Sequence, residues 1–407
     1  MYSAPIEGWG GFMTHRPLRV LYSFPHPLGD AGIGTTAINQ VRGLVSDGHR
    51  VTVYTTSTSQ SLPSDVRVVR TMTIAGHRVP HRAIGVERAY RYHDYFVARV
   101  IGRRAAAFDL VHVWPRSCTA TLAAARRSHL PSFRESPSPH TASAFAEARR
   151  AAEAVGLTVP ANHSHYDDPA RLTVEEAEYA AADFVLAPSD YVVQTYLERG
   201  MSARQLLRHR YGFDPASFPA PGPRDPERPF TALFLGRGEP NKGLHHALRA
   251  WVNAGLAGRG RFLIGGSIQQ SYERVIADLL IEARVERMGF VHDKDRLLRE
   301  SDILLLPTAT EGSALVTYEA MASGVVPLVS DAAGAPIVNG VDGFVHRVDD
   351  VITLTDQIVR LEGDRGLLAQ MRANALERRD ELSWASAGVE LARAYRTGLR
   401  QLRASTE

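Results

Sequence analysis

Short apolar runs alternate with amphipathic stretches along the first half of the chain. Runs rich in Val, Leu, Tyr and Phe predict buried strands at 18–25, 50–56, 66–69, 109–114, 184–189 and 206–213. Stretches with a helical period lie between them, for example at 35–49 and 174–182. Strands that alternate with helices predict a parallel sheet built from βαβ units.

The alternation stops in a proline-rich segment and then restarts. Residues 215–229, PASFPAPGPRDPERP, contain six prolines in fifteen positions. Proline has no backbone N–H and a fixed φ, so this segment cannot form a central strand or a helix interior. We interpret it as a linker. Strands are predicted again at 230–236, 261–267, 285–290, 302–308 and 325–330, and the chain after residue 349 has a helical pattern.

The two series of strands predict an α/β protein with two Rossmann-like domains that face each other. The expected division is a tail at 1–17, a first domain at 18–214, the linker at 215–229, a second domain at 230–384 and a C-terminal helix at 385–407. A length of 407 residues fits two hydrophobic cores. Ligands of such sheets bind beyond the carboxyl ends of the strands, so we expect the site in the cleft between the domains.

Composition narrows the class of protein. The chain is 44% hydrophobic and 22% charged with a net charge of +3, which is typical of a globular protein and does not favour nucleic acid as a partner. Cys118 is the single cysteine, so an intrachain disulfide and a cysteine-based zinc site are excluded. The first 17 residues lack the features of a signal peptide, and no apolar run is long enough to span a membrane. We expect a cytoplasmic protein.

Two glutamates, Glu311 and Glu319, lie eight positions apart in the segment EGSALVTYEAMASG (311–324), which is otherwise mostly small or apolar. Ser313 is expected to cap a helix that follows a buried strand. Glu311 would then lie beside the helix N-terminus and Glu319 about 12 Å deeper. The helix N-terminus favours an anion, which free amides of the first turn would bind. These amides belong to Gly312, Ser313, Ala314 and Leu315.

One elongated ligand can meet all of these groups, with hydroxyls on each glutamate and a phosphate on the amides between them. A nucleotide sugar has this order of parts. The alternative is that Glu311 only accepts backbone donors and that Glu319 is a solvated helix residue.

A second segment, FLGRGEPNKG (234–243), favours the ligand interpretation. Arg237 and Lys242 follow a predicted strand and precede a helix, where both cations can reach a phosphate in the cleft. The alternative is that both are ordinary surface cations. Lys242 is noteworthy because the chain contains only one other lysine, Lys294.

These residues identify a family resemblance. The chain resembles the family 4 glycosyltransferases of GT-B fold over residues 18–384 and beyond. The motifs that carry the resemblance are GR-x4-KG at 236–243 and E-x7-E at 311–319. Four further segments support it: ADFVLAPSDYVVQTYLERG (182–200), YGFDPASF (211–218), MGFV (288–291) and NGVDGFV (339–345).

The resemblance implies a retaining transfer of a hexosyl unit from a nucleotide-diphosphate sugar, most often a UDP-sugar, to a hydroxyl acceptor. It places Arg237 and Lys242 on the donor diphosphate as part of the catalytic site. Glu311 and the amides that follow it contact the donor sugar, and Glu319 contacts the ribose.

The resemblance also bears on the base and on metals. The backbone near Phe290 and Val291 would border the base. No divalent metal or other cofactor is implied, because the two cations and the helix terminus can neutralise the charge that grows on the departing phosphate. The family mechanism is front-face attack, in which a phosphate oxygen of the donor takes the acceptor proton.

The amino-terminal half matches the family less closely. The family's Gly-Gly pair in the first loop is Ala31-Gly32 here, so only Gly32 carries over. A family histidine follows the fifth strand and reaches the donor sugar, and His140 is expected to take this catalytic position. The alternative is an exposed loop histidine. The glutamate that the family commonly has shortly after the position of Pro336 is missing.

The sequence contains no motif that identifies the acceptor. A small molecule, a lipid and a glycan all remain open, while nucleic acid is not expected. Two other functions fit the same architecture. One is a nucleotide-sugar epimerase that needs no acceptor, and the other is a non-catalytic nucleotide-sugar-binding protein.

Three further patterns are interpreted as structural. Asp293 and Asp295 resemble a metal-binding pair but are expected to cap a helix. The segment NHSHYDD (162–168) lacks known metal spacing and is expected to form a loop over the acceptor. The basic, aromatic helix at 89–106 is expected to pack Tyr95, Phe96 and Val100 inward, and the alternative is that it docks on an anionic membrane.

Overall fold

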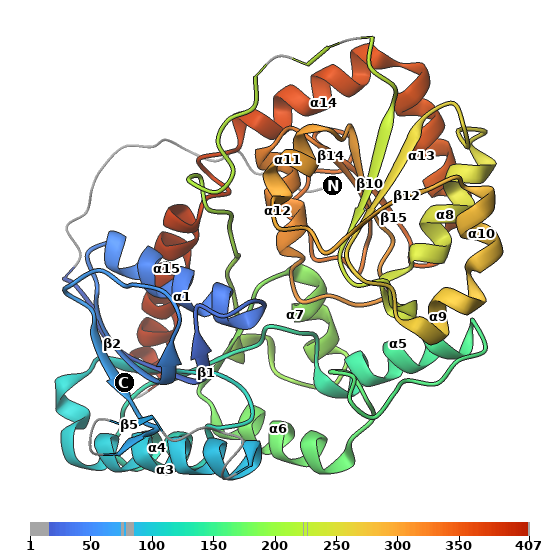
Figure 1. Ribbon diagram of the computed structural model, residues 1–407. Helices are drawn as coiled ribbons and strands as arrows, with labels where there is room; N and C mark the ends of the chain where they lie inside the picture. Colours follow the sequence, from blue (N-terminus) through green and yellow to red (C-terminus); the bar gives the residue numbers. More distant parts are fainter. Residues whose placement is uncertain (1–15, 75–76, 79–84, 223, 226, 406–407) are drawn as a thin grey trace.

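A computed structural model describes residues 16–74, 77–78, 85–222, 224–225 and 227–405. The chain folds into two α/β lobes, each built on a parallel sheet, and Figure 1 shows them side by side. The predicted pair of facing Rossmann-like domains is therefore confirmed. Most of the predicted tail, residues 1–15, lies outside the described residues.

The first domain is built on a seven-stranded sheet among the described residues, in the order β3-β2-β1-β6-β7-β8-β9 with all strands parallel. The strands are β1 (Arg19–Leu28), β2 (Arg50–Thr58), β3 (Arg67–Arg70), β6 (Leu110–Val113), β7 (Ser132–Glu135), β8 (Phe184–Ala187) and β9 (Leu206–Arg208). The helices are α1 (Ile33–Ser46), α3 (Val86–Arg104), α4 (Thr119–Arg127), α5 (Thr141–Glu153), α6 (Pro169–Ala181) and α7 (Asp190–Leu197). Short elements complete the domain: β4 (Thr73–Ile74), β5 (His77–Arg78), η1 (Ala105–Ala107) and η2 (Ala203–Gln205).

The second domain has a six-stranded parallel sheet in the order β12-β11-β10-β13-β14-β15 within the described part of the chain. Its strands are β10 (Thr231–Leu235), β11 (Arg261–Gly265), β12 (Glu286–Gly289), β13 (Ile303–Leu306), β14 (Val326–Ser330) and β15 (Phe344–His346). Its helices are η3 (Pro240–Lys242), α8 (Leu244–Asn253), α9 (Gln270–Val275), α10 (Ala277–Glu282), α11 (Lys294–Arg299), α12 (Leu315–Ala322), α13 (Val351–Gly363) and α14 (Arg365–Glu377).

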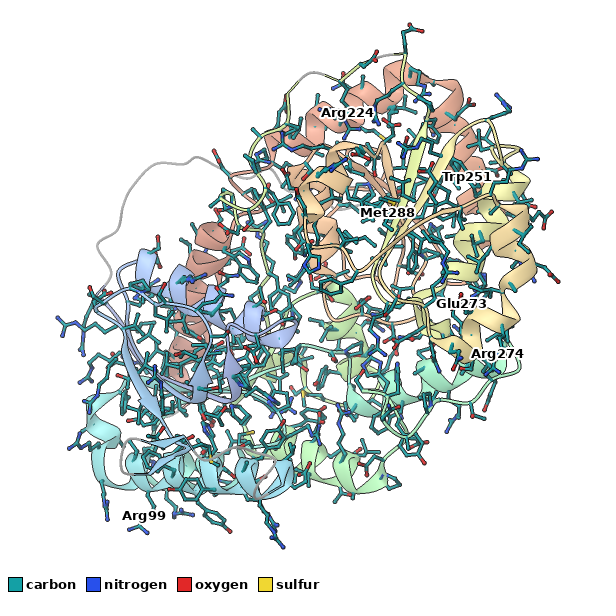
Figure 2. The ribbon with its side chains drawn as sticks, viewed as in Figure 1. Arg99, Arg224, Trp251, Glu273, Arg274 and Met288 are labelled. Atoms are coloured by element: carbon teal, nitrogen blue, oxygen red, sulfur yellow. The ribbon has the colours of Figure 1, made fainter. Side chains whose placement is uncertain are left out.

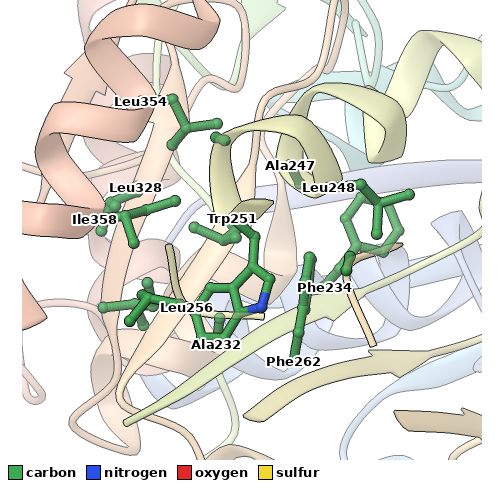
Figure 3. Packing of buried hydrophobic residues seen from close by; sticks show 14 of the residues in the cluster. Ala232, Phe234, Ala247, Leu248, Trp251, Leu256, Phe262, Leu328, Leu354 and Ile358 are labelled. Carbon is green, nitrogen blue, oxygen red and sulfur yellow. The ribbon is translucent and has the colours of Figure 1, made fainter. Parts of the chain in front are cut away.

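A large apolar cluster fixes the second sheet beneath its helices. Trp251 of α8 is fully buried and packs with Phe262 of β11 and with Leu354 and Ile358 of α13, as Figure 3 shows. Burial of such side chains stabilises each by about 1.5–3 kcal/mol. The rigid sheet gives the loops at its carboxyl edge a fixed platform.

The last helix, α15 (Trp384–Ala404), crosses back to the first domain, as predicted. It packs on α1 so closely that a Cβ on Gly388 would lie 2.3 Å from the carbonyl carbon of Gly43. Tyr395 is fully buried in the first domain, where its hydroxyl lies 2.6 Å from Nδ1 of His112. The chain therefore connects the two domains twice, through residues 209–230 and through α15.

Three expectations about elements are corrected by the structure. The strand predicted at 206–213 ends at Arg208, and the chain then turns toward the second domain. Strand β7 was not predicted because two of its four residues, Arg134 and Glu135, are charged. Strand β15 was also missed, since it has only three residues.

The amphipathic helix expected at 89–106 is α3, but its orientation differs from the prediction. Tyr95 is 64% exposed, while Val97 and Ile101 are fully buried. Phe96 and Val100 are only partly buried. Within the described residues, no helix is long and apolar enough to cross a bilayer.

Candidate functional site

The loop after β10 folds onto the loop after β13. The amide of Ala309 and the hydroxyl of Thr308 both donate to the carbonyl of Asn241, at 2.8 and 2.9 Å. Gly243 has φ +70°, and a Cβ there would lie 2.0 Å from the carbonyl oxygen of Pro307. Only glycine fits this position, for both reasons. The glycine of the KG pair therefore allows Lys242 to reach the end of β13.

Lys242 and Glu311 form an ion pair although they are 69 residues apart in sequence. Their side chains are 22% and 21% exposed, so the pair is largely shielded from solvent. Glu311 is held from behind, because its amide donates to the carbonyl of Ala332 at 3.1 Å. A ligand can form hydrogen bonds with both charged groups, because each has unused hydrogen-bonding capacity.

Glu319 is paired with the second lysine of the chain. Lys294 Nζ lies 2.5 Å from Glu319 Oε1, and the carboxylate side chain is only 12% exposed. The two lysines of this chain thus pair with the two glutamates of the E-x7-E motif. Sequence reasoning missed Lys294 as a site residue. The signal was its rarity in a chain whose positive charge is otherwise arginine.

Arg237 extends from the end of β10 into solvent, with 71% of its side chain exposed. Its Nη2 lies 2.8 Å from Oε1 of Glu239, whose side chain is only 6% exposed. Burial raises the pKa of Glu239, but His163, Arg237 and Lys242 outweigh this effect and leave the pKa below its usual value. These contacts therefore favour the ionised form of Glu239, which stands in sequence between the two predicted diphosphate cations. Sequence reasoning did not single it out.

The turn before α12 differs from the expectation. Ala314, not Ser313, is the N-cap residue, and it makes no side-chain cap. Ser313 Oγ instead donates to the carbonyl of Gly334 at 2.9 Å. The amide of Ala314 is not free, because it donates to Ala333 at 3.2 Å. Among the described residues, the amides of Gly312, Ser313 and Leu315 have no hydrogen-bond partner and are available to a ligand.

The first domain meets this turn at Gly312. A Cβ on Gly312 would lie 1.9 Å from the carbonyl oxygen of Pro137, which follows β7. The hydroxyl of Ser189, at the N-terminus of α7, donates to the Gly312 carbonyl at 2.5 Å. Two loops at the carboxyl edge of the first sheet therefore close against the segment that carries Glu311.

His140 lies three residues beyond Pro137, and β7 is the fifth strand of the seven-stranded sheet in chain order. The histidine is 6% exposed, so the alternative of an exposed loop residue is wrong. Burial, followed by the charges of Arg199 and Arg134, lowers its pKa to about 4. Its Nδ1 accepts from the amide of Ala142 at 3.3 Å, which leaves the proton of the neutral ring on Nε2.

The remaining predicted donor residues lie on two different loops. Gly32 has φ +81° and is the N-cap of α1, at the carboxyl edge of the first sheet, where a Cβ would meet open space. Phe290 is 78% exposed just after β12, and its ring centroid lies 4.8 Å from that of His292. Val291 packs with the second-domain cluster that includes Leu297. Within the described part of the chain, none of these three residues forms a hydrogen bond or ion pair with Lys242 or Glu311.

The aspartates that were not interpreted as metal ligands have structural partners. Asp293 caps α11 by accepting from the amide of Arg296 at 3.0 Å, as predicted. Asp295 pairs with Arg299, and Asp168 caps α6. Within the described part of the chain, no group of three or more His, Cys, Asp or Glu side chains is arranged to hold a metal.

Two family models match the chain in succession. The model for Glycosyltransferase Family 4 matches residues 31–217, and the model for Glycosyl transferases group 1 matches residues 221–378. The boundary between the matches falls in the proline-rich segment.

Individual relatives agree with this assignment. D-inositol 3-phosphate glycosyltransferase of Streptomyces bingchenggensis is 25% identical over 92% of this chain and 87% of its own length. The enzyme of the same name from Nocardia farcinica is 30% identical, but the match spans only 48% of this chain and about half, 46%, of that relative.

Solved structures show the same fold. Sucrose-phosphate synthase from Thermosynechococcus elongatus has a TM-score of 0.66 at 19% identity, over 95% of this chain and 100% of that one. Anabaena Alr3699/HepE in complex with UDP-glucose has a TM-score of 0.63 at 18% identity, over 93% and 100%. With the two family models side by side, this chain belongs to the family 4 glycosyltransferases of GT-B fold.

Proposed function

We propose that the protein transfers a sugar from a nucleotide-diphosphate sugar, with UDP as the preferred nucleotide, to a hydroxyl acceptor with retention of configuration. One observation carries the proposal: Arg237, Lys242 and Glu311 lie together at the carboxyl edge of the second sheet, with free amides beside them. The solved relative with bound UDP-glucose supports the choice of donor.

The charges of the site suit a diphosphate. The ammonium of Lys242 and the guanidinium of Arg237 would neutralise the phosphates, and the amides of Gly312, Ser313 and Leu315 would donate to the same oxygens. In the proposed step, the bond from the anomeric carbon to the phosphate oxygen breaks while the acceptor oxygen bonds to the same face. The phosphate oxygen takes the acceptor proton. Lys242 and Arg237 stabilise the charge on this leaving group without a divalent metal.

The two glutamates would orient the donor. Glu311 would accept from hydroxyls of the sugar, with its carboxylate held by Lys242. Glu319 would accept from the ribose with the oxygen that Lys294 leaves unused. His140, neutral and close to the Gly312 turn, would donate its Nε2 proton to a sugar hydroxyl or the adjacent phosphate.

A thermal-shift panel with UDP-, GDP- and ADP-sugars tests the proposal. Donor binding should raise the melting temperature by mass action, in EDTA as well as in magnesium. The donor that binds should be slowly hydrolysed to a nucleoside diphosphate and a free sugar, with water as the acceptor. An isomerised nucleotide sugar in the same incubation would instead identify an epimerase. Binding without any turnover, even with an acceptor library, would identify a non-catalytic binding protein.

We also propose a peripheral membrane contact through α3. The solvent face of this helix carries four exposed arginines, Arg88, Arg91, Arg99 and Arg103, together with the exposed rings of Tyr92 and Tyr95. Arg99 points away from the sheet on this side of the molecule, as Figure 2 shows. A basic face with aromatic anchors suits an anionic bilayer.

Co-sedimentation with vesicles tests the membrane contact. The protein should bind vesicles that contain phosphatidylglycerol and not those of phosphatidylcholine alone. Replacing Tyr95 and Arg99 with serine should weaken this binding by several-fold. Equal binding by the variant, or none by the wild type, would contradict the proposal.

A further inference from the structure

The connection between α5 and α6 reaches across from the first domain to the second. Helix α5 contacts η3, the turn that ends at Lys242, and in Figure 1 α5 is drawn just below α9 of the second domain. The connection after α5, residues 154–168, brings Nε2 of His163 to 3.3 Å from Oε2 of Glu239. Both side chains are almost fully buried, at 7% and 6% exposure. This segment therefore lies over the loop that carries the two predicted diphosphate cations.

The hydrogen bonds of His163 show which nitrogen of its ring carries the proton. Its Nδ1 accepts from the amide of His165 at 3.0 Å, so this nitrogen carries no proton. The proton of the ring is then on Nε2, which donates to Glu239. The other oxygen of Glu239 pairs with Arg237 at 2.8 Å. One hydrogen bond and one ion pair thus connect His163 of the first domain, through Glu239, to Arg237.

His165 lies beside the same group of charges, with Lys242 and Arg171 near enough to repel a proton from its ring. Burial first, and then these charges, lower its pKa to about 3, so the imidazole is neutral. Its Nδ1 is buried and has no hydrogen-bond partner among the described residues. A buried polar nitrogen without a partner is costly and is uncommon unless a ligand or water completes it.

We propose that residues 154–168 are a lid over the donor, in which His163 positions Arg237 through Glu239 and His165 hydrogen-bonds a hydroxyl of the transferred sugar through Nδ1. This inference rests on the proposed nucleotide-sugar function. A neutral imidazole suits a sugar hydroxyl, which can both donate and accept, whereas the cations Arg237 and Lys242 already match the phosphates. Through this lid, residues of the first domain would contribute to the choice of donor.

Two histidine variants separate the two roles. Calorimetric titrations compare the affinity of each variant for UDP with its affinity for UDP-glucose. If the protein instead binds a GDP- or ADP-sugar, that sugar and its free nucleotide are compared. His163→Ala should weaken the binding of nucleotide and nucleotide sugar alike, by about tenfold, because it acts on the diphosphate through Arg237. His163→Gln should recover most of the affinity, since the amide of glutamine can still donate to Glu239. His165→Ala should weaken only the nucleotide sugar, because UDP lacks the group that His165 contacts.

Asp167→Asn is the matched control on the same segment. Asp167 pairs with Arg149 of α5 at 2.9 Å within the first domain, in an exposed position, so both affinities should stay at the wild-type value. Near-ultraviolet circular dichroism would show that each variant is folded.

The outcomes distinguish the lid from the function on which it rests. A wild-type protein that binds none of the nucleotides would overturn the proposed function and the lid with it. Wild-type binding with unchanged affinities in folded His163→Ala and His165→Ala would overturn the lid alone. An equal loss of UDP and UDP-glucose affinity in His165→Ala would overturn the sugar contact.

Discussion

The two domains present different chemistry to each other where they meet. The second domain presents charged pairs, Lys242–Glu311 and Arg237–Glu239, at the ends of two parallel strands. The first domain meets them with a carbonyl at Pro137, the hydroxyl of Ser189 and neutral histidines. Under the proposed function, the charged side chains of the second domain would neutralise the donor diphosphate, and the first domain would cover the donor.

Removal of the C-terminal helix should have the largest effect on both domains, because residues of this helix pack in the core of each. Trp384 lies in a second-domain cluster, while Leu391 and Tyr395 are part of the first-domain core. We expect a chain truncated after Leu382 to be insoluble or to lack fixed tertiary structure, as judged by expression and near-ultraviolet circular dichroism. Deletion of residues 405–407 is the control. A soluble, active truncation would contradict the role of α15.

The charged pairs of the second domain should be essential for turnover. Glu311→Ala and Lys242→Ala should each lower the transfer rate by about a hundred- to a thousandfold. Lys242→Ala removes charge stabilisation from the leaving phosphate, and Glu311→Ala removes the carboxylate that orients the donor sugar. Glu362→Ala, which alters an exposed pair with Arg259, should leave the rate unchanged. Near-wild-type turnover in either site variant would show that the pair is not the site.

The junction between the two sides should tolerate little added volume. A methyl group on Gly312 would lie 1.9 Å from the carbonyl oxygen of Pro137, so Gly312→Ala must push the two domains apart. A displacement of about 1 Å can cost about a hundredfold in rate, which is the loss we expect in kcat. Gly363→Ala has open space around it and is the control. Unchanged kcat in Gly312→Ala would mean that closure at this point is not needed.

Neutral buried histidines of the first domain should make the protein sensitive to acid. His93 is fully buried between Ser23 and Thr71, and burial, with the charge of His26, lowers its pKa to about 3. Between about pH 6.5 and pH 3 the unfolded chain binds a proton at this histidine that the folded chain does not bind. Stability should therefore fall by about 1.4 kcal/mol per pH unit as pH drops through this range.

The contribution of His93 can be isolated by substitution. Denaturant unfolding of His93→Gln between pH 7 and pH 4.5 should show a shallower loss of stability than the wild type, by one proton. The variant's lower stability at pH 7 does not affect this comparison of slopes. Parallel slopes would contradict the assigned neutral state.

Most of the fold was predictable because apolar runs mark parallel strands. Strand β7 was not predicted, because the apolar pattern that marks a buried strand does not include two adjacent charged residues. Arg134 is 1% exposed and bonded to Glu175 and Glu178, whereas Glu135 is fully buried and accepts from Gln40 and Tyr211. Partners distant in sequence compensate each charge, so a local pattern cannot show that the segment is buried.

The candidate site was predictable only in part, for a similar reason. Arg237, Lys242, Glu311 and Glu319 stand in spaced motifs within short segments. Lys294, Glu239 and His163 join the site only through contacts between loops or between domains. The expected cap at Ser313 was wrong because the loop at Gly334 competes for its hydroxyl.

The central claim is that one domain binds the diphosphate of a nucleotide sugar, and a crystal structure with the donor found in the thermal-shift panel tests it most directly. We predict phosphate oxygens within about 3 Å of the Arg237 guanidinium and the Lys242 ammonium, with sugar hydroxyls on Glu311 and ribose hydroxyls on Glu319. A donor whose diphosphate lies away from the carboxyl ends of β10 and β13, with these four side chains unchanged, would contradict it.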